Sequence, residues 1–486
     1  MILPLIQHES MPPGVFMFLF LLFFQYNYSG KRKRYISMIS YDKERFIRHL
    51  QAMVQIPTVS SADPEKTRVE EFEKLHKCLA EAYPLVHKTL KREIIGKCAL
   101  LYTWKGTGKS DQLPLLMTAH QDVVPEGDHA MWTYPPFSGH VDEEGIMYGR
   151  GTTDSKCNIQ AYLDAIELLI EDGFTPDYDL YLAFGYNEEI MGGPGAAGVL
   201  LHDELQKRGI QLGMAIDECG GVSKKNDKYV AEIFVSEKGY ADHEIYIDAK
   251  GGHSAYPPLH NALGKLGKAI YDLEENRMTP KLCEPVIKQM KADAPFRKDE
   301  TVQALFADPE GNEEVLKELA ADSALLNQML RTTTTPTMAK GSDQANILPE
   351  HASVITNSRI LPTETLADLE AHFRSVLPEE VQFRLIKGHN PPAVSSTESY
   401  GYRLLQKIMG EKYPGITFIP SMMAGGTDSR YYCDLSPSHS VYRFTGIFYN
   451  GRSGGAHSVN EHIDTEVLCD NVEFYVQLFS RYGEEL

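Results

Sequence analysis

Four short apolar segments in this chain each lead to residues that can bind a metal ion. The segments are residues 115–119, 146–148, 180–186 and 212–216, and they lead to His120, to Asp154, to the pair Glu188 and Glu189, and to the pair Asp217 and Glu218. Such runs are typical of buried strands, and open α/β sheets bind ligands beyond the carboxyl ends of their strands. The sequence therefore predicts an α/β fold with a mostly parallel central sheet and a site at one edge.

The residues at these positions, together with His457 near the C-terminus, offer imidazole and carboxylate ligands. This mixture of nitrogen and oxygen donors suits zinc or a similar divalent ion. The pattern indicates a metallohydrolase.

The spacing of these residues supports a βαβ arrangement. His120 and Asp154 lie 154 − 120 = 34 residues apart, and Asp154 and Glu189 lie 189 − 154 = 35 apart. Each interval has room for about one helix and one strand. Apolar residues recur at helical spacing over residues 156–172, and Gly173 is the expected stop. Asp154 is thus expected at the entrance of a helix.

Six motifs resemble the signatures of a known family. They are HQDVVP (residues 120–125), GRGTTDSK (149–156), NEE (187–189), DE (217–218), GGHS (251–254) and TDSRY (427–431). In this order they are similar to the motifs of the dizinc peptidases that include aminoacylase, carboxypeptidase S and acetylornithine deacetylase. The resemblance covers nearly everything after Met38 and is closest to the carboxypeptidase S branch. It implies a zinc-exopeptidase fold with two Zn²⁺ ions, or Co²⁺ or Mn²⁺ in their place.

Length and charge agree with an enzyme of this kind. A chain of 486 residues is too long for one compact core. The net charge of −19 argues against nucleic acid or an anionic membrane as a partner. Seven scattered cysteines favour a reducing compartment. We therefore expect a cytoplasmic enzyme without stable membrane association.

The N-terminal segment differs from the rest. Residues 15–24 are apolar but too short for a bilayer, which needs about 20 residues. The basic run 31–34 lies on the wrong side for a signal peptide. Residues 1–37 are interpreted as a doubtful extension, with a real anchor or targeting segment, and hence a membrane or secreted form, as the alternative.

The remaining chain is expected to form two domains. Alternating apolar residues at 243–247 and 353–360, a helical pattern at 364–376 and a strand at 381–386 differ from the fully apolar runs before them. The resemblance implies an inserted α+β lid, of the type that mediates dimerisation. We place this lid at residues 238–391 and the catalytic domain at 38–237 and 392–486.

Candidate roles follow for the first motifs. His120 is expected to bind one ion through one ring nitrogen. Asp122, on the same face of an extended segment, is expected to hold the other nitrogen. The resemblance makes Asp154 the carboxylate that bridges both ions, although an aspartate at this place is also a common helix N-cap.

Two pairs of adjacent carboxylates pose an ambiguity, because successive side chains of extended backbone point in opposite directions. The resemblance assigns Glu189 to the metal and Glu188 to proton transfer. For the second pair both ligands are known in the family, and we prefer Asp217 to Glu218. His457 completes the second ion site by resemblance.

The lid supplies the other candidate residues. The resemblance gives His253 the stabilisation of the oxyanion, often from a neighbouring subunit, which fits a homodimer. It gives Asn346 and Arg359 the binding of the substrate's carboxylate, for which arginine's planar fork is suited. A salt bridge at a strand edge is the alternative for Arg359. The turn at residues 425–428 is expected to line the same pocket.

These interpretations converge on hydrolysis of an amide bond next to a free carboxylate. A carboxypeptidase or dipeptidase is the first expectation, and an N-acyl amino acid hydrolase is the second. The alternative from another class is an inactive, metal-free binding protein on the same fold, which would have lost Glu188 or a ligand. Neither loss is seen in the sequence.

Overall fold

The computed structural model describes residues 41–486, apart from residues 62, 64 and 191–194. These residues belong to one compact unit, Tyr41–Leu486. The doubtful extension at residues 1–37 lies outside the described part of the chain. Nowhere in that part is there a helix long and apolar enough to cross a membrane.

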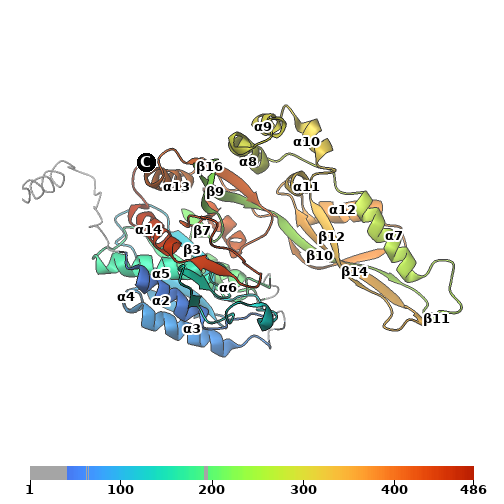
Figure 1. The fold of residues 1–486 in the computed structure, drawn as a ribbon, viewed down its shortest axis with the longest axis horizontal. Coiled ribbons are helices and arrows are strands. Elements are labelled where there is room, and N and C mark those ends of the chain that lie inside the picture. Colours follow the sequence, from blue (N-terminus) through green and yellow to red (C-terminus); the bar gives the residue numbers. More distant parts are fainter. Residues whose placement is uncertain (1–40, 62, 64, 191–194) are drawn as a thin grey trace, which may run out of the picture. The chain divides into compact units, whose positions relative to one another are not determined.

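A nine-stranded sheet forms the centre of the larger half of the molecule (Figure 1). Its order is β1 (Lys91–Ile95), β2 (Ala99–Trp104), β6 (Leu180–Gly185), β3 (Leu115–His120), β7 (Met214–Asp217), β17 (Val441–Arg443), β9 (Lys228–Glu237) and β16 (Thr417–Met423), with β8 (Gly221–Lys225) beside β9. The four central strands β6, β3, β7 and β17 run parallel to one another, and β9 and β16 are also a parallel pair. The pairs β1–β2, β2–β6 and β17–β9 are antiparallel. The prediction of a mostly parallel central sheet is confirmed.

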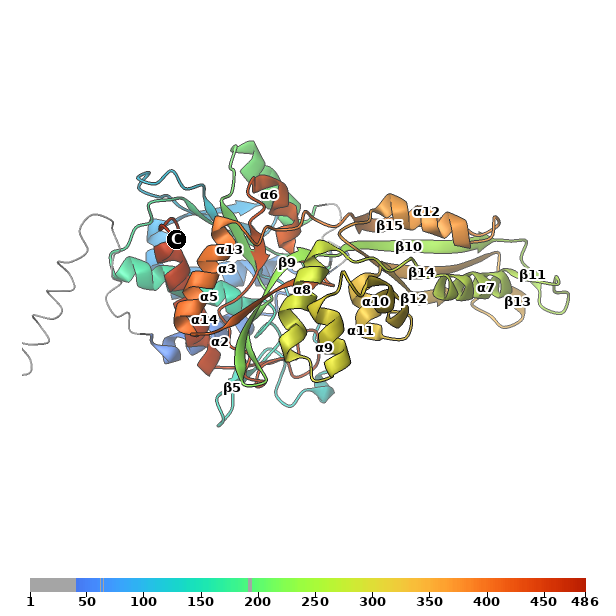
Figure 2. The same cartoon turned by 90° about the horizontal axis from the view of Figure 1, so that it is seen from above.

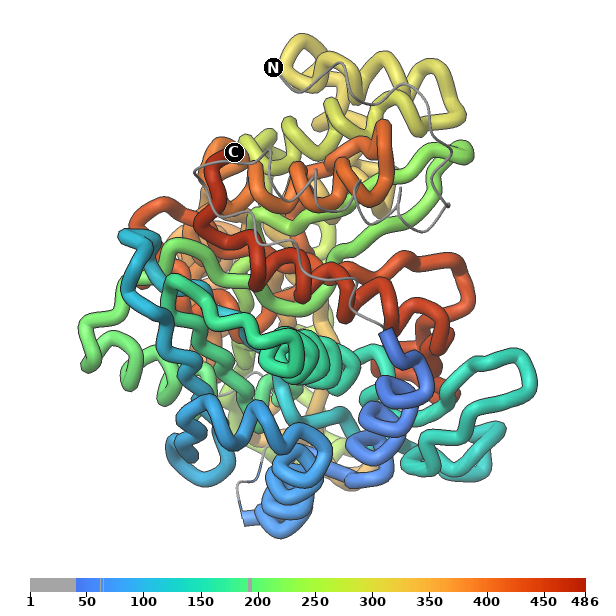
Figure 3. Tube along the Cα trace, turned by 90° about the vertical axis from the view of Figure 1, so that its left-hand side faces the viewer, coloured from blue at the N-terminus to red at the C-terminus, as the bar shows by residue number. Residues whose placement is uncertain are grey.

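Helix α5 (Lys156–Glu171) follows the predicted segment closely, and Gly173 ends it with φ +75°. Nearly every side chain of this helix is buried. The reason is that α14 (Glu466–Arg481), α2 (Lys43–Val54) and α4 (Pro84–Thr89) pack around it, as Figure 3 shows for α2 and α14. The remaining helices of this half are α3 (Val69–Ala82), α6 (Ala197–Lys207), α13 (Tyr400–Lys412) and the 3₁₀ segment η3 (Asp428–Leu435).

The predicted helix between His120 and Asp154 is wrong. Residues 121–145 contain the 3₁₀ turn η1 (His129–Met131) and the strand β4 (His140–Val141), and no α-helix. Strand β5 (Ile146–Tyr148) pairs with β4 and with β18 (His462–Asp464) in a separate small sheet. Pro125, Pro135 and Pro136 remove the donors and the dihedral freedom that a helix needs here.

A second sheet of four antiparallel strands lies within residues 239–389 (Figure 2). Its order is β12 (Thr333–Lys340), β14 (His351–Ile360), β10 (Gly239–Asp248) and β15 (Gln382–His389). The helices α7 (Ala262–Glu275) and α12 (Leu366–Val376) share an apolar core with one face of this sheet. Thr365 and Asp368 form a capping box that fixes the start of α12. The expected α+β unit is therefore present.

Between α7 and β12 the chain adds α8 (Glu284–Asp293), η2 (Ala294–Phe296), α9 (Glu300–Ala307), α10 (Glu313–Leu319) and α11 (Ala324–Leu330). These helices bury a core of their own that includes Leu361 and Met422, and α8 packs against β16. The expected boundaries at residues 238 and 391 fall between strands of the two sheets. Strand β9 of the first sheet ends at Glu237 and β10 of the second begins at Gly239, while β15 of the second ends at His389, before β16 of the first. The division into a catalytic and a lid domain itself remains a prediction.

Candidate active site

Three parallel strands bring the predicted site residues to one edge of the central sheet. Strand β3 ends at His120 and β7 ends at Asp217, while β6 ends at Gly185, shortly before Glu188. Because β3 lies between β6 and β7, the residues that follow these strands converge.

Asp154 lies between two histidines. Its Oδ1 is 2.9 Å from Nε2 of His120, and its Oδ2 is 3.1 Å from Nε2 of His457. The two oxygens of one carboxylate thus face two different imidazoles. Ser155, not Asp154, is the residue before α5, so the carboxylate of Asp154 does not act as the helix cap.

Each histidine has a second carboxylate beside it. Oε1 of Glu218 lies 3.2 Å from Nε2 of His120, and Oε2 of Glu189 lies 2.8 Å from Nε2 of His457. Oε1 of Glu189 is buried and has no hydrogen-bond partner among the described residues. The cluster therefore divides into two groups that share Asp154.

The preference for Asp217 does not agree with this geometry. The Oδ1 atom of Asp217 accepts a hydrogen bond from the backbone N–H of Glu218 at 2.9 Å, and its Oδ2 accepts one from Ser429 at 2.8 Å. Asp217 is thus turned toward backbone donors, while Glu218, on the opposite side of the chain, faces His120.

Asp122 holds the other side of the cluster. Nδ1 of His120 lies 2.9 Å from the carbonyl oxygen of Asp122 and 3.4 Å from its Oδ1. The carboxylate of Asp122 also accepts hydrogen bonds from the backbone N–H groups of Glu188 and Glu189, both at 3.2 Å. Asp122 therefore fixes both the histidine ring and the segment that carries the two glutamates.

Glu461 is a site residue whose role was not predicted from the sequence. Its fully buried carboxylate accepts hydrogen bonds from Nη1 of Arg150 at 2.8 Å, from the N–H groups of Gly151, Thr153 and Asp154 at 2.9–3.1 Å, and from the Thr153 hydroxyl at 2.9 Å. These five donors hold the loop that presents Asp154. The signal available in the sequence was its place four residues after the predicted ligand His457.

The segment with the TDSRY motif also reaches the site. Glu237 accepts hydrogen bonds from the N–H and hydroxyl of Thr427 at 3.0 and 2.7 Å. The buried Arg430 donates to the Thr427 carbonyl, and its charge opposes the rise of the Glu188 pKa. Burial raises the pKa of Asp428 to about 6, although Arg430 opposes this shift. The turn at 425–428 therefore lies close to the cluster.

The electrostatics of the cluster reflect its crowded carboxylates. Burial and the neighbouring Asp154 raise the pKa of Glu218 to about 8, although His120 opposes the shift. Burial also raises the pKa of Glu188 well above its usual value. Hydrogen bonds to Asp154 and Glu189 raise the pKa of His457 to about 10. In the absence of bound cations, Glu188 and Glu218 thus favour their neutral forms, and His457 favours its charged form.

These residues fit divalent cations. Ligand atoms of His120, Asp154 and Glu189 lie within 4.8 Å of one another, and so do those of His120, Glu188 and Glu218. Buried carboxylates are costly unless positive charge neutralises them, and the buried, unbonded oxygen of Glu189 is such a case. Two imidazoles with several carboxylates are a donor set typical of zinc hydrolases.

The structure does not bring the three lid candidates into this cluster. His253 in β11 (Gly252–His253) pairs with Ile347 in β13 (Ile347–Leu348), and Ser254 donates a hydrogen bond to the Asn346 carbonyl at 3.0 Å. Both His253 and Asn346 are exposed. Arg359 lies in β14, with its guanidinium 4.8 Å from the centre of the Tyr240 ring.

An α/β sheet with imidazoles and carboxylates gathered beyond its parallel strands defines a metallohydrolase. Residues 116–481 match the sequence pattern of Peptidase family M20/M25/M40. The chain is 32% identical over 421 residues to "Probable carboxypeptidase S-like 2" of Dictyostelium discoideum, which covers 84% of this chain and 79% of that protein. It is 31% identical over 454 residues to "N-fatty-acyl-amino acid synthase/hydrolase PM20D1.1" of Danio rerio. That match covers 90% of this chain and 85% of the Danio rerio protein.

A solved structure agrees at the level of the fold. The M20 family metallo-carboxypeptidase Sso-CP2 from Sulfolobus solfataricus superposes with a TM-score of 0.66 at 19% identity, covering 90% of this chain and 99% of that one. The chain belongs to peptidase family M20/M25/M40, as the motifs predicted. It is a metallopeptidase or amidohydrolase, and its relatives support hydrolysis of peptide or amide bonds.

Replacing Glu461 by Gln should weaken metal binding by roughly 10–100-fold, as expected for residues that orient metal ligands. The amide nitrogen would face N–H donors and leave some of them unsatisfied, which should cost roughly 1–3 kcal/mol of stability or more. Metal affinity and thermal unfolding measure the two effects. Glu466→Gln is the control, because Glu466 is 68% exposed and pairs only at the surface with Lys43. Parental metal affinity in Glu461→Gln would contradict the assigned role.

Proposed function

We propose that this chain is a two-zinc exopeptidase that cleaves an amide bond next to a free carboxylate. The observation that carries the proposal is the position of Asp154, whose two oxygens face His120 and His457 at 2.9 and 3.1 Å. One ion would be held by His120, Asp154 and Glu218, and the other by Asp154, Glu189 and His457. Co²⁺ or Mn²⁺ could replace zinc at such ligands.

The protein's own residues then have distinct tasks. When bound, the ions lower the pKa of water and polarise the scissile carbonyl. Glu188 accepts the proton of the attacking water and returns it to the leaving nitrogen. Burial raises the pKa of Glu188, which makes it a stronger base than an exposed glutamate. The carbonyl oxygen of Asp122 accepts a hydrogen bond from the Nδ1–H of His120, which leaves Nε2 free to bind an ion.

Arg359 is our proposed anchor for the substrate's carboxylate. Its Nε donates to Asn357 at 3.1 Å, and its ring contact is with Tyr240. Within the described part of the chain, its two terminal nitrogens have no hydrogen-bond or ion-pair partner, so a planar pair of donors is free to bind a carboxylate. This supports substrate binding over the strand-edge salt bridge.

Replacing Arg359 by Lys should lower kcat/KM by an amount equivalent to roughly 1.5–3 kcal/mol, because the bidentate geometry is lost. Amidation of the substrate's carboxylate should harm the parent enzyme similarly. Arg384→Lys is the control, since Arg384 lies on the edge strand β15 and is 67% exposed. Equal cleavage of the amidated substrate and the free acid would rule out the carboxylate role.

His253 and Asn346 form part of the same proposal. They lie together where β11 meets β13, so they act as one unit. Either closure of the lid or a second subunit would bring them to the substrate. We therefore include a homodimer in the proposal.

An N-acyl amino acid hydrolase is the second candidate, and the N-fatty-acyl-amino acid hydrolase of Danio rerio supports it. Hydrolysis of a panel of dipeptides and N-acyl amino acids, with and without added zinc, separates the two. Faster zinc-dependent cleavage of dipeptides is the result we expect. Preference for N-acyl amino acids would favour the second candidate, and metal-replete protein that cleaves neither class would favour a binding protein.

A further inference from the structure

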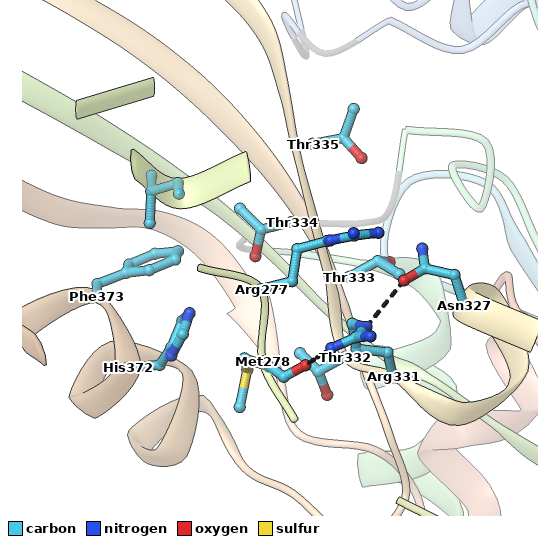
Figure 4. A pocket seen from close by; sticks show the side chains of 11 residues that line it. Arg277, Met278, Asn327, Arg331, Thr332, Thr333, Thr334, Thr335, His372 and Phe373 are labelled. Carbon is cyan, nitrogen blue, oxygen red and sulfur yellow. Dashed lines mark hydrogen bonds between the residues drawn. The ribbon is translucent and has the colours of Figure 1, made fainter. Parts of the chain in front are cut away.

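A pocket of about 190 Å³ lies in the second sheet's half of the molecule, away from the residues of the proposed catalytic cluster. It is bordered by the segment after α7, by α11, by the start of β12 and by α12. Figure 4 shows Arg277 and Arg331 among its lining side chains, with Asn327, Thr334 and His372 around them. No candidate site residue named above contributes to its lining.

Arg331 is a buried charge in this pocket. It is only 7% exposed, and its Nε donates to Asn327 at 2.9 Å while Nη1 donates to the Met278 carbonyl. These bonds use two of its five N–H donors, and no carboxylate lies within ion-pair distance among the described residues. A buried guanidinium without an anionic partner is costly.

Arg277 adds a second positive charge. Its two terminal nitrogens each donate to the Ala321 carbonyl at 3.3 Å, and it too has no carboxylate partner in the described part of the chain. Burial lowers the pKa of Arg331, and the charge of Arg277 lowers it further. The nearby acid Glu364 is already bound to the Thr332 hydroxyl and to Lys281, at 2.6 Å from the latter.

Alternation along the strands separates this pocket from the proposed carboxylate anchor. Ser358 pairs with Ala241, which belongs to the core under α7 and α12, and the next residue, Arg359, pairs with Tyr240. Successive side chains of a strand point to opposite faces. The hydroxyl of Thr334, which lines the pocket, is hydrogen-bonded to the Ser358 hydroxyl at 2.9 Å. The pocket therefore lies on the face of the sheet that α7 and α12 cover, and Arg359 points to the opposite face.

We propose that this pocket binds a small oxyanion, namely a phosphate or carboxylate group held between Arg277 and Arg331. Such a group would accept hydrogen bonds from the unused N–H groups of Arg277 and Arg331. Its negative charge would also offset the repulsion between the two guanidinium groups. The volume of about 190 Å³ has room for a small anion and is below the roughly 300 Å³ at which drug-like ligand sites begin.

The bound anion would also affect the crossing between the two sheets. The carbonyl of Arg331 accepts a hydrogen bond from Nζ of Lys238 at 2.7 Å, and Gln328 accepts another at 2.6 Å. Lys238 is the residue between β9 and β10. An anion that orders Arg331 would therefore stabilise the segment around Gln328 and Arg331, to which Lys238 is hydrogen-bonded.

Calorimetric titration of the metal-loaded full chain with inorganic phosphate, and separately with acetate, tests the site at constant ionic strength in chloride. We expect saturable binding in the parent and in the control Arg384→Gln, and at least tenfold weaker binding in Arg277→Gln. The exposed position of Arg277 makes this substitution compatible with folding. The anion that binds more tightly identifies the preferred group.

Arg277→Glu provides a second variant. Its carboxylate should pair with Arg331, raise the unfolding temperature without added anion and abolish the response to phosphate. Absence of saturable binding in the parent would overturn the proposal. So would undiminished binding in Arg277→Gln, which would place the anion elsewhere, for example at the catalytic ions. Amide hydrolysis does not enter this readout, so the test is independent of the proposed function.

Discussion

Replacing Glu188 by Gln is expected to lower kcat by roughly 10²–10⁴-fold while the metal content stays at the parental value. Gln keeps the size and hydrogen bonding of the side chain but cannot accept the proton of the attacking water. Steady-state kinetics and metal analysis of the same purified sample measure both quantities.

Glu189→Gln is the matched variant. The side chain of Glu189 lies 2.8 Å from His457, and a neutral amide is a poorer ligand than a carboxylate, so this variant should lose one metal ion. If Glu188→Gln loses metal and Glu189→Gln keeps it, the two roles are reversed. If both variants stay fully active, the metallohydrolase mechanism is wrong.

Replacing Glu218 by Gln should weaken metal binding by more than the roughly 10–100-fold typical of residues that only orient ligands. The carboxylate of Glu218 lies 3.2 Å from His120 and is proposed to bind an ion directly. Asp217→Asn should keep metal near the parental value, because Asp217 accepts backbone hydrogen bonds from Glu218 and Ser429.

Competition with a chelator measures both affinities, and thermal unfolding reveals any loss of stability in Asp217→Asn. Metal loss in Asp217→Asn combined with metal retention in Glu218→Gln would restore the ligand choice preferred from the sequence.

Strand and helix patterns near the site were readable from the sequence. The apolar runs that end at His120 and Asp217 became β3 and β7, and the periodic segment after Asp154 became α5. These elements have strong local signals, namely continuous burial and helical spacing. The interval before Asp154 lacked such a signal, and its prolines produced loops and a small sheet instead of a helix.

The order of Asp217 and Glu218 was not readable for a physical reason. Of two adjacent side chains, one faces the site and the other binds hydrogen-bond donors elsewhere. The choice depends on where those donors lie in the folded chain. For Asp217 one such donor is the N–H of Ser429, 212 positions away in the sequence. Glu461 is similar, since it binds the loop around Asp154 from 307 positions away. Contacts at such separations leave no local pattern.

In the second sheet, the alternation at 243–247 and 353–360 correctly predicted β10 and β14. The roles of His253, Asn346 and Arg359 depend on how substrate and lid meet, and they remain proposals. The pocket around Arg277 and Arg331 had no motif at all, because it forms where three separate segments of the chain meet.

Stepwise zinc reconstitution of chelator-treated protein tests the central claim, a centre of two ions bridged by Asp154. The account predicts that amide hydrolysis is absent from the metal-free protein, returns with added zinc and reaches its plateau at two equivalents per chain. Hydrolysis that persists without metal, or a plateau at one equivalent, would contradict it.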